Sequence, residues 1–251
     1  MRRFVIKVGT NLLTQVDNLL AVDFLRGLVC EFKDLLGCQI ELILVTSGAV
    51  AAGRGELGAE RGAGAESLVD KQVLAAVGQS SLMQQYYREF TLAHQVKVAQ
   101  VLLSVYDFEN PTSIKNTQNT LECLLGKRIL PIVNENDVTA TEELECMAND
   151  RLAARVAKLL KADGLILLTD VEGIFDCDPD GHAPAKFLPA LRRESLPSIC
   201  GSARPGGHGG VTTKLEAARM VECPVWVVNG RKKKVLAKII LAGENPGTII
   251  Q

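Results

Sequence analysis

The chain lacks the residue patterns of several common kinds of site. Its three histidines, His94, His182 and His208, are far apart in the sequence and suggest no metal cluster. Its seven cysteines are an odd number at wide spacings and include no Cys-x-x-Cys pair, which argues against a disulfide framework and a structural zinc site. We expect these cysteines to be reduced thiols, most of them buried.

Long apolar runs are also missing. No stretch approaches the about 20 apolar residues that a membrane-spanning helix needs. Arg2 and Arg3 precede an apolar run, but Lys7 and Gly9 interrupt it before it reaches the length of a signal peptide. The net charge of -1 gives no overall field that would attract nucleic acid or an anionic membrane. The sequence therefore predicts a cytoplasmic protein that binds neither.

Alternating strand-like and helix-like segments fill the chain of 251 residues, 47% of which are hydrophobic. Strands separated by helices predict βαβ units, so we expect an α/β fold: a three-layer α/β/α sandwich around a mainly parallel sheet, in a single domain over 1–251. Gly-rich loops are expected at 53–67 and 175–210. The expected helices lie in 22–37 (with Gly37 as C-cap), 67–90, 113–126, 148–162, 212–221 and 232–243, and the expected strands in 3–9, 39–50, 97–104, 128–137, 164–173, 224–230 and 247–251.

Polar clusters follow four of the apolar runs: "KVGTN", "TSGAV", "NEND" and "TDVEG". Ordinary turns use the same residue types. In open parallel sheets, however, ligands bind beyond the carboxyl ends of the strands, where all four clusters would meet. The recurrence therefore predicts a ligand site at that edge of the sheet.

Lys7 stands inside the first apolar strand, two residues before Gly9. A lysine there is rarely buried without a partner. It either extends its amine to the surface or meets a phosphate at the strand end. In the second case Gly9 lets the backbone approach the anion closely.

A second lysine, Lys214, follows glycines in "GGHGGVTTKLEAA". We expect Thr212 and Thr213 to cap the next helix and Lys214 to lie in its first turn. The segment is not a Walker A motif, because the glycine spacing differs and Leu215 follows the lysine. Two lysines beside glycine turns favour phosphoryl transfer. Asp150 suits either a helix N-cap or the orientation of these lysines.

Neither a nucleophile elbow with a Ser-His-Asp order nor a Gly-x-Gly-x-x-Gly turn after the first strand is evident, which disfavours a hydrolase and a Rossmann dehydrogenase. Seven segments, in this order, instead resemble the glutamate 5-kinases of the amino acid kinase family: "KVGTNLLT", "LVTSGAVAAG", "LAAVGQSSLMQQY", "PIVNENDVTATEE", "NDRLAARVA", "LLTDVEGIFDCDP" and "GGVTTKLEAA". They cover nearly the whole chain.

The resemblance implies the amino acid kinase fold and the phosphorylation of the γ-carboxylate of L-glutamate by ATP with Mg²⁺, the first step of proline biosynthesis. It also implies a homo-oligomer, dimer or tetramer. The C-terminal PUA domain of many members is expected to be absent. By the same resemblance, Lys7, Lys214 and Asp150 are catalytic; Ser47, Asp137 and Asn149 bind glutamate; and Lys7, Gly9, Thr169, Asp170, His208, Gly209, Gly210, Val211, Thr212, Thr213 and Lys214 bind ATP.

Two positions depart from the family pattern. Ala148 stands where an aspartate is usual, so the resemblance implies one polar contact fewer to glutamate. His208 stands where a threonine is usual, beside the nucleotide. Two alternatives remain: another amino acid kinase, such as an acetylglutamate, carbamate or uridylate kinase, and a non-catalytic amino acid sensor. The hydroxyl in "TSGAV" disfavours the first, and the presence of both lysines disfavours the second.

Overall fold

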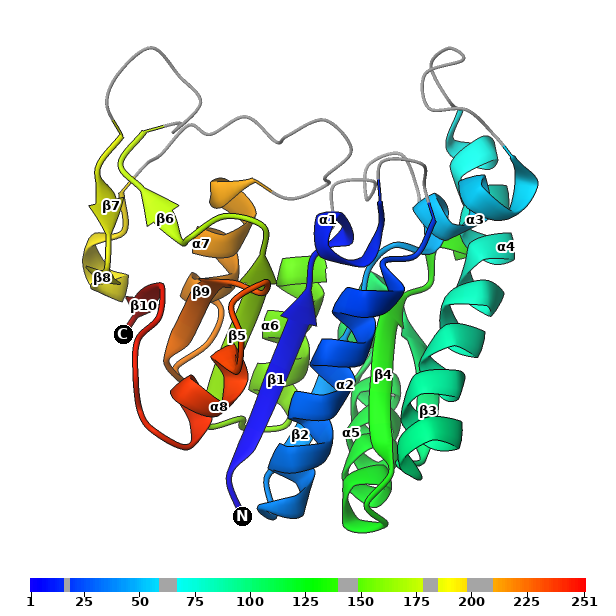
Figure 1. Cartoon of the computed structure of the whole chain (residues 1–251), viewed down its shortest axis with the longest axis horizontal. Coiled ribbons are helices and arrows are strands. Elements are labelled where there is room, and N and C mark those ends of the chain that lie inside the picture. Colours follow the sequence, from blue (N-terminus) through cyan, green and yellow to red (C-terminus); the bar gives the residue numbers. More distant parts are fainter. Residues whose placement is uncertain (16–18, 59–66, 140–148, 178–184, 198–209) are drawn as a thin grey trace.

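The computed structural model places a largely parallel sheet at the centre of the molecule (Figure 1). Its eight strands have the order β3-β4-β2-β1-β5-β9-β10-β8. Among the neighbouring strands of this sheet, β9 and β10 are antiparallel and all other pairs are parallel. The structure describes residues 1–15, 19–58, 67–139, 149–177, 185–197 and 210–251. The strands are β1 (Arg3–Val8), β2 (Glu41–Val45), β3 (Val98–Leu103), β4 (Leu130–Glu135), β5 (Gly164–Thr169), β8 (Ala190–Leu191), β9 (Val225–Asn229) and β10 (Thr248–Ile250), with a separate hairpin of β6 (Ile174–Phe175) and β7 (Phe187–Leu188).

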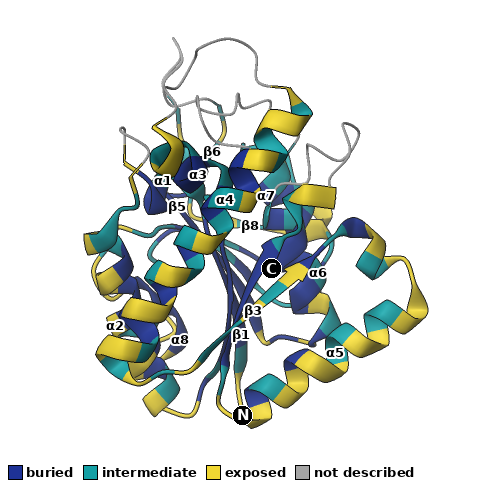
Figure 2. Cartoon of the chain, turned by 90° about the vertical axis from the view of Figure 1, so that its right-hand side faces the viewer, coloured by how far each residue is buried: buried dark blue, intermediate teal, exposed yellow. Residues whose placement is uncertain are grey.

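Helices cover both faces of this sheet, which confirms the predicted three layers (Figure 2). One face packs against α2, α8 and the end of α4, and the other packs against α5, α6 and α7. The helices are α1 (Thr10–Leu13), α2 (Val22–Gly37), α3 (Ala49–Leu57), α4 (Leu68–Tyr86), α5 (Pro111–Gly126), α6 (Asn149–Leu159), α7 (Val211–Arg219) and α8 (Val235–Ile240). Shorter helical segments are η1 (Tyr87–Leu92, a π-helix), η2 (Val105–Phe108), η3 (Asp137–Thr139) and η4 (Arg193–Ser195).

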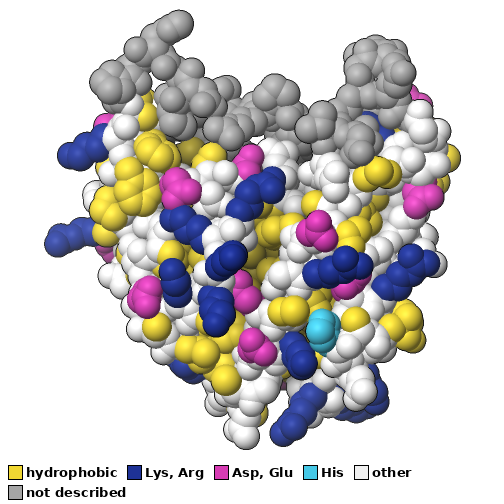
Figure 3. All heavy atoms as spheres, viewed as in Figure 1, with side chains coloured by type: hydrophobic (Ala, Val, Ile, Leu, Met, Phe, Trp, Pro, Cys, Tyr) yellow, Lys and Arg dark blue, Asp and Glu magenta, His cyan; other side chains and the backbone are white. Residues whose placement is uncertain are grey.

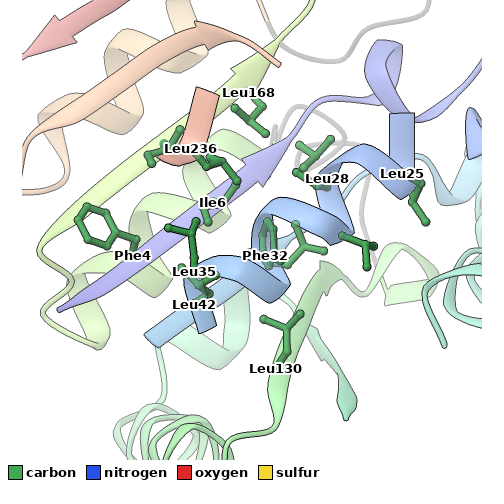
Figure 4. Close-up of a cluster of buried hydrophobic side chains, with 14 of the residues drawn as sticks. Phe4, Ile6, Leu25, Leu28, Phe32, Leu35, Leu42, Leu130, Leu168 and Leu236 are labelled. Carbon is green, nitrogen blue, oxygen red and sulfur yellow. The ribbon is translucent and has the colours of Figure 1, made fainter. Parts of the chain in front are cut away.

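The alternation of side chains along β1 decides where Lys7 lies. Phe4 and Ile6 point into the core under α2 and α8 (Figure 4), and Val5 points into the opposite core under α6 and α7. Because successive side chains of a strand face opposite sides, Lys7 shares the face of Val5. The strand therefore directs the Lys7 amine towards α6 and α7.

The helix predicted at 22–37 has these bounds in the structure, but the prediction that Gly37 is its C-cap is wrong. Gly37 is the last helical residue and Cys38 is the C-cap. The chain then turns through Gln39, which has a positive φ of 60°. The turn after α2 is thus made by a glutamine in the left-handed region that usually favours glycine.

Both predicted loops contain regular structure. Residues 53–57 of the first belong to α3, and the second includes β6, β7, β8 and η4. The glycines of the first segment predicted a loop, but Gly53 lies inside α3. A Cβ at this position would stand 2.0 Å from the Leu74 carbonyl oxygen of α4, so only glycine fits. The glycine permits close helix packing instead of breaking the helix.

The expectation that most cysteines are buried is wrong for those that the structure describes. Cys30, Cys38 and Cys123 are exposed, and Cys177 and Cys223 are partly buried; none of the five forms a disulfide. In the face shown in Figure 3, positive and negative side chains are interspersed, as the near-zero net charge suggests. Within the described stretches, no helix is both long and apolar enough to cross a membrane.

Candidate active site

Three charged side chains meet beyond the carboxyl ends of β1 and β5: Lys7, Asp150 and Lys214, here called the lysine triad. The Lys7 Nζ lies 2.8 Å from Asp150 Oδ1, and the Lys214 Nζ lies 3.2 Å from Asp150 Oδ2. The exposed fractions are 7% for each lysine and 0% for Asp150. Lys7 therefore does not extend its amine to the surface. Asp150 is the second residue of α6, so it is not the N-cap of this helix. Its carboxylate pairs with the two lysines instead.

The triad is a buried site with an excess of positive charge. For Lys7, burial lowers the pKa and outweighs the attraction of Asp150, while Lys214 lowers it further. For Asp150, burial tends to raise the pKa, but the two lysines outweigh it and hold the pKa well below its usual range. Two ammonium groups share one carboxylate, so the site favours a further anion.

Lys214 lies near the start of α7, whose N-cap is Gly210. The prediction that Thr212 and Thr213 are the capping residues is wrong, because the N-cap is Gly210 and both threonines lie within the first turn. The Thr213 hydroxyl lies 2.8 Å from Asp150 Oδ2 and 2.9 Å from the Gly210 carbonyl oxygen. The first turn of α7, beginning at Val211, is thereby fixed to the triad. Backbone N–H groups at such a helix start favour anions.

The loop after β1 completes this side of the site. The Gly9 N–H donates to the Leu168 carbonyl oxygen of β5 at 3.1 Å. The Asn11 amide donates to Asp170 Oδ2 at 3.1 Å, and the Thr169 hydroxyl donates to Asp170 Oδ1 at 3.2 Å. A Cβ on Gly9 would stand 3.9 Å from the Lys7 Nζ. The glycine therefore leaves open space in front of that amine.

The residues His208 and Gly209 were predicted to bind ATP, and Ala148 was noted as a departure from the family pattern. All three lie outside the described residues.

A second cluster lies beyond β2 and β4 and consists of neutral side chains: Thr46, Ser47, Gln79, Asn134 and Asn149, here called the amide cluster. The Asn149 Nδ2 lies 2.9 Å from the Thr46 carbonyl oxygen, 2.9 Å from Ser47 Oγ and 3.1 Å from Asn134 Oδ1. The Asn134 Nδ2 donates to Gln79 Oε1 at 2.8 Å. Asn149 Oδ1 and Gln79 Nε2 are buried and have no hydrogen-bond partner among the described residues. One acceptor and one donor are thus left over.

Two carboxyl groups lie beside this cluster, at the end of β4. Burial raises the pKa of Glu135 to about 8, with a further rise from the negative charge of Asp137 and an opposing effect of Arg155. Burial raises the pKa of Asp137 to about 6. Each group would lose its proton more readily beside a cation. The pair therefore suits a positively charged ligand group.

Asn149 and Asp150 are consecutive residues that connect the two clusters. The Asn149 side chain belongs to the amide cluster, and the Asp150 side chain belongs to the lysine triad. In the sheet, β2 and β4 lie on one side of β1, and β5 and β9 lie on the other. The order of the strands along the chain therefore reverses direction at β1. Ligands of open α/β sheets bind at such switch points. The start of α6 thus places an anion site directly beside a neutral polar site.

Four residues of this region were given no role in the site from the sequence. Thr46, Asn134 and Glu135 are within the quoted motifs "TSGAV" and "NEND", whose position after strands was a usable signal. Gln79 is within the quoted segment "LAAVGQSSLMQQY", but it lies inside a helix and so does not follow a strand. Of the predicted residues that the structure describes, Lys7, Lys214, Asp150, Ser47 and Asn149 belong to the two clusters, and Gly9, Asp137, Thr169, Asp170, Gly210, Val211, Thr212 and Thr213 lie at the adjoining strand and helix ends.

Comparison with known proteins agrees with this architecture. The sequence profile of the amino acid kinase family matches residues 2–229. The chain belongs to the amino acid kinase family. The family resemblance of the seven motifs and the predicted fold are thereby confirmed.

Several relatives within the amino acid kinase family are similar to this chain over nearly its whole length. The glutamate 5-kinase of Symbiobacterium thermophilum is 42% identical over 256 residues, which cover 99% of this chain and 95% of the relative. The glutamate 5-kinase of Shewanella woodyi is 38% identical over 253 residues, or 98% of this chain and 67% of the relative. The solved structure of T. acidophilum isopentenyl phosphate kinase matches with a TM-score of 0.68 at 18% identity, over 99% of this chain and all of that one, which shows a shared fold.

Proposed function

We propose that this chain transfers the γ-phosphoryl group of ATP to the γ-carboxylate of L-glutamate, giving L-glutamyl 5-phosphate and ADP, the first step of proline biosynthesis. The observation that carries the proposal is the pair Asn149–Asp150, which joins a buried cationic triad to a neutral acceptor site. The naming of close relatives as glutamate 5-kinases supports the choice of acceptor.

The reaction needs positioning and charge neutralisation more than proton transfer. The γ-carboxylate of glutamate is already ionised at neutral pH, so it can attack without a general base. One of its oxygens bonds to the γ-phosphorus, the bond to the bridging oxygen breaks, and the electron pair leaves with ADP. Lys7 and Lys214 neutralise charge on the phosphoryl oxygens during this transfer, and Asp150 holds both amines at the site.

Magnesium fits this site as a companion of ATP. The described residues include no group of three or more His, Cys, Asp or Glu side chains that would hold a metal ion by themselves. Mg²⁺ is commonly bound through substrate phosphates and one or two carboxylates. When bound, it supplies positive charge that neutralises the phosphates. Asp170, beside Thr169 at the end of β5, is the carboxylate that we assign to that side.

The acceptor side suits an amino acid better than a phosphate ester. The side chains of the amide cluster are hydroxyls and amides, whereas phosphate recognition usually requires arginine or lysine. The nearby Glu135 and Asp137 suit the α-ammonium group of glutamate. The Arg155 guanidinium, at the next turn of α6, lies 5.4 Å from the Phe108 ring centre and donates to the Val105 carbonyl oxygen. We therefore assign Ser47, Asn149 and Asp137 to glutamate.

An acceptor screen tests the proposal. Purified protein with Mg-ATP is given L-glutamate, N-acetylglutamate, aspartate, carbamate or UMP, with hydroxylamine present to trap any acyl phosphate, and ADP and hydroxamate are measured. We expect hydroxamate with L-glutamate only. ADP release with another acceptor alone would refute the substrate, and no turnover in protein that still binds ATP would favour the sensor alternative. Dimer or tetramer assembly and a cytoplasmic location stay predictions.

A further inference from the structure

Helix α4 sends two polar side chains to the strand ends that hold the amide cluster. Gln79 contacts Asn134, at the end of β4, and Tyr86 contacts Thr46, just after β2. The two residues are seven apart, which is two helical turns, so they lie on the same face of α4. That face bonds the ends of two neighbouring strands of the sheet.

The hydrogen-bond directions in the amide cluster follow from one unambiguous acceptor, the Thr46 backbone carbonyl. Since a carbonyl only accepts, the amide nitrogen of Asn149 must face it. The same nitrogen faces Asn134, which must therefore present its oxygen and direct its own nitrogen to Gln79. The Gln79 oxygen ends this sequence of bonds. Asn149 Oδ1 is left as the unused acceptor.

Tyr86 fixes the other end of the same arrangement. Its side chain is fully buried, and its hydroxyl lies 2.7 Å from Thr46 Oγ1. The Thr46 hydroxyl proton is directed to the Ser47 carbonyl oxygen at 3.1 Å. Tyr86 must then be the donor to Thr46, because a buried hydroxyl proton without an acceptor is unfavourable. The tyrosine thereby restrains the turn that carries both the Thr46 carbonyl and Ser47.

The backbone of α4 is fixed against α3, which begins directly after this turn at Ala49. A Cβ on Gly78 would stand 1.9 Å from the Ala49 carbonyl oxygen and 2.2 Å from the Gly53 nitrogen. The two helices therefore meet with backbone against backbone at the residue before Gln79. Figure 1 shows α3 and α4 together at one end of the sheet.

We propose that α4 is a positioning element of the acceptor site: Gln79 and Tyr86, acting through Asn134 and Thr46, fix the amide orientation of Asn149 so that its Oδ1 accepts from the α-ammonium group of the substrate. The inference rests on the proposed function for the identity of the substrate. The proposal predicts a defect that is confined to the binding of the acceptor. A loosened or reversed Asn149 amide weakens the binding of the acceptor and leaves ATP binding intact.

The test uses near-isosteric substitutions with matched controls at nearby exposed positions. Tyr86→Phe removes one hydroxyl, and Gln79→Met removes the acceptor oxygen. Tyr87→Phe, at the first residue of η1, and Gln84→Met, on α4, make the same chemical changes at exposed positions. KM for L-glutamate, KM for ATP, kcat and Tm are measured for all four and for the wild type.

We expect Tyr86→Phe and Gln79→Met each to raise KM for L-glutamate by about fivefold or more, the equivalent of losing one hydrogen bond, with KM for ATP within twofold of the wild type. The two controls should match the wild type in every parameter. An unchanged KM for glutamate in both Tyr86→Phe and Gln79→Met would overturn the proposal. A parallel rise of both KM values with a fall in Tm would also overturn it, since that indicates general loosening.

The outcome for α4 can be separated from the outcome for the proposed function. Wild-type protein that is inactive with L-glutamate but active with another acceptor refutes the proposed substrate. The role of α4 is then measured with that acceptor, and the same selective rise in its KM is expected. If Gln79→Met does not fold, Tyr86→Phe with its Tyr87→Phe control decides the question alone.

Discussion

Replacing Asp150 with asparagine keeps the size of the side chain and removes its charge from the lysine triad. Two buried ammonium groups, now 2.8 and 3.2 Å from carboxylate oxygens, would lose this partner. No other ion pair of Lys7 or Lys214 occurs among the described residues. The asparagine oxygen can still accept a hydrogen bond from one lysine, but the site keeps two uncompensated positive charges.

The expected cost follows from these distances and the burial. At an effective dielectric constant of about 20, each contact contributes roughly 5–6 kcal/mol of attraction. Much of this attraction offsets the desolvation of the three groups, so the net effect is smaller. Breaking a buried ion pair by removing one partner typically costs about 3–5 kcal/mol. We expect Asp150→Asn to lower the free energy of unfolding by that amount at pH 7 and kcat by about 100-fold or more.

The pH dependence distinguishes a charge effect from lost packing. Burial already lowers the pKa of Lys7, and Asp150 opposes that effect. In the variant the pKa falls further, so between that value and the unfolded value of about 10.4 the folded state binds fewer protons than the unfolded state. The stability of the variant therefore rises with pH in this range. The stability gap to the wild type should narrow between pH 7 and pH 10.

Urea unfolding followed by circular dichroism at both pH values measures the gap, and ADP release with L-glutamate measures kcat. A variant as stable as the wild type at pH 7 would refute the buried triad. A gap of equal size at pH 7 and pH 10 would refute the electrostatic reasoning.

Three further predictions concern the triad, the Glu135 carboxyl and the helix contact. Lys7→Ala and Lys214→Ala should each lower kcat by about 100-fold or more in the ADP assay, and near-normal turnover would remove that lysine from the mechanism. Burial and the negative charge of Asp137 raise the pKa of Glu135 to about 8, from about 4.3 in the unfolded chain, so wild-type stability should fall as pH rises through this range. Glu135→Gln should flatten the decline in urea midpoints, and an unchanged slope would contradict this. Gly78→Ala, whose methyl would stand 1.9 Å from a carbonyl oxygen of α3, should cost about 1–3 kcal/mol, whereas Gly27→Ala on the exposed side of α2 should be neutral or stabilising; equal Tm changes would refute the close contact.

The sequence was most informative at β1, where one charged side chain stands within a run of apolar residues. Periodic apolar residues predicted β1, α2 and the parallel sheet, and the charge of Lys7 within an apolar run marked the strand end that meets α6. Its partner was less evident, because an aspartate at a helix start suits an N-cap equally well. Only the fold brings Asp150, 143 positions further along the chain, to within 2.8 Å of Lys7.

Other features depend on tertiary contacts that a local pattern does not encode. Gly53 was interpreted as a loop residue because glycine usually interrupts helices, but its missing side chain lets α3 and α4 touch. Gln79 and Tyr86 occupy ordinary positions in a helix, and their importance appears only when their partners after β4 and β2 are in place. The left-handed turn at Gln39 has no glycine to predict it.

The most direct test of the central claim follows one oxygen atom. L-Glutamate labelled with ¹⁸O in its γ-carboxylate is incubated with the protein, Mg-ATP and hydroxylamine, and the products are analysed by mass spectrometry. If the carboxylate attacks phosphorus, hydroxylamine releases phosphate that carries one ¹⁸O, in amounts equal to those of ADP and hydroxamate. ADP formed with unlabelled phosphate and no hydroxamate would show that water is the acceptor, and would contradict the account.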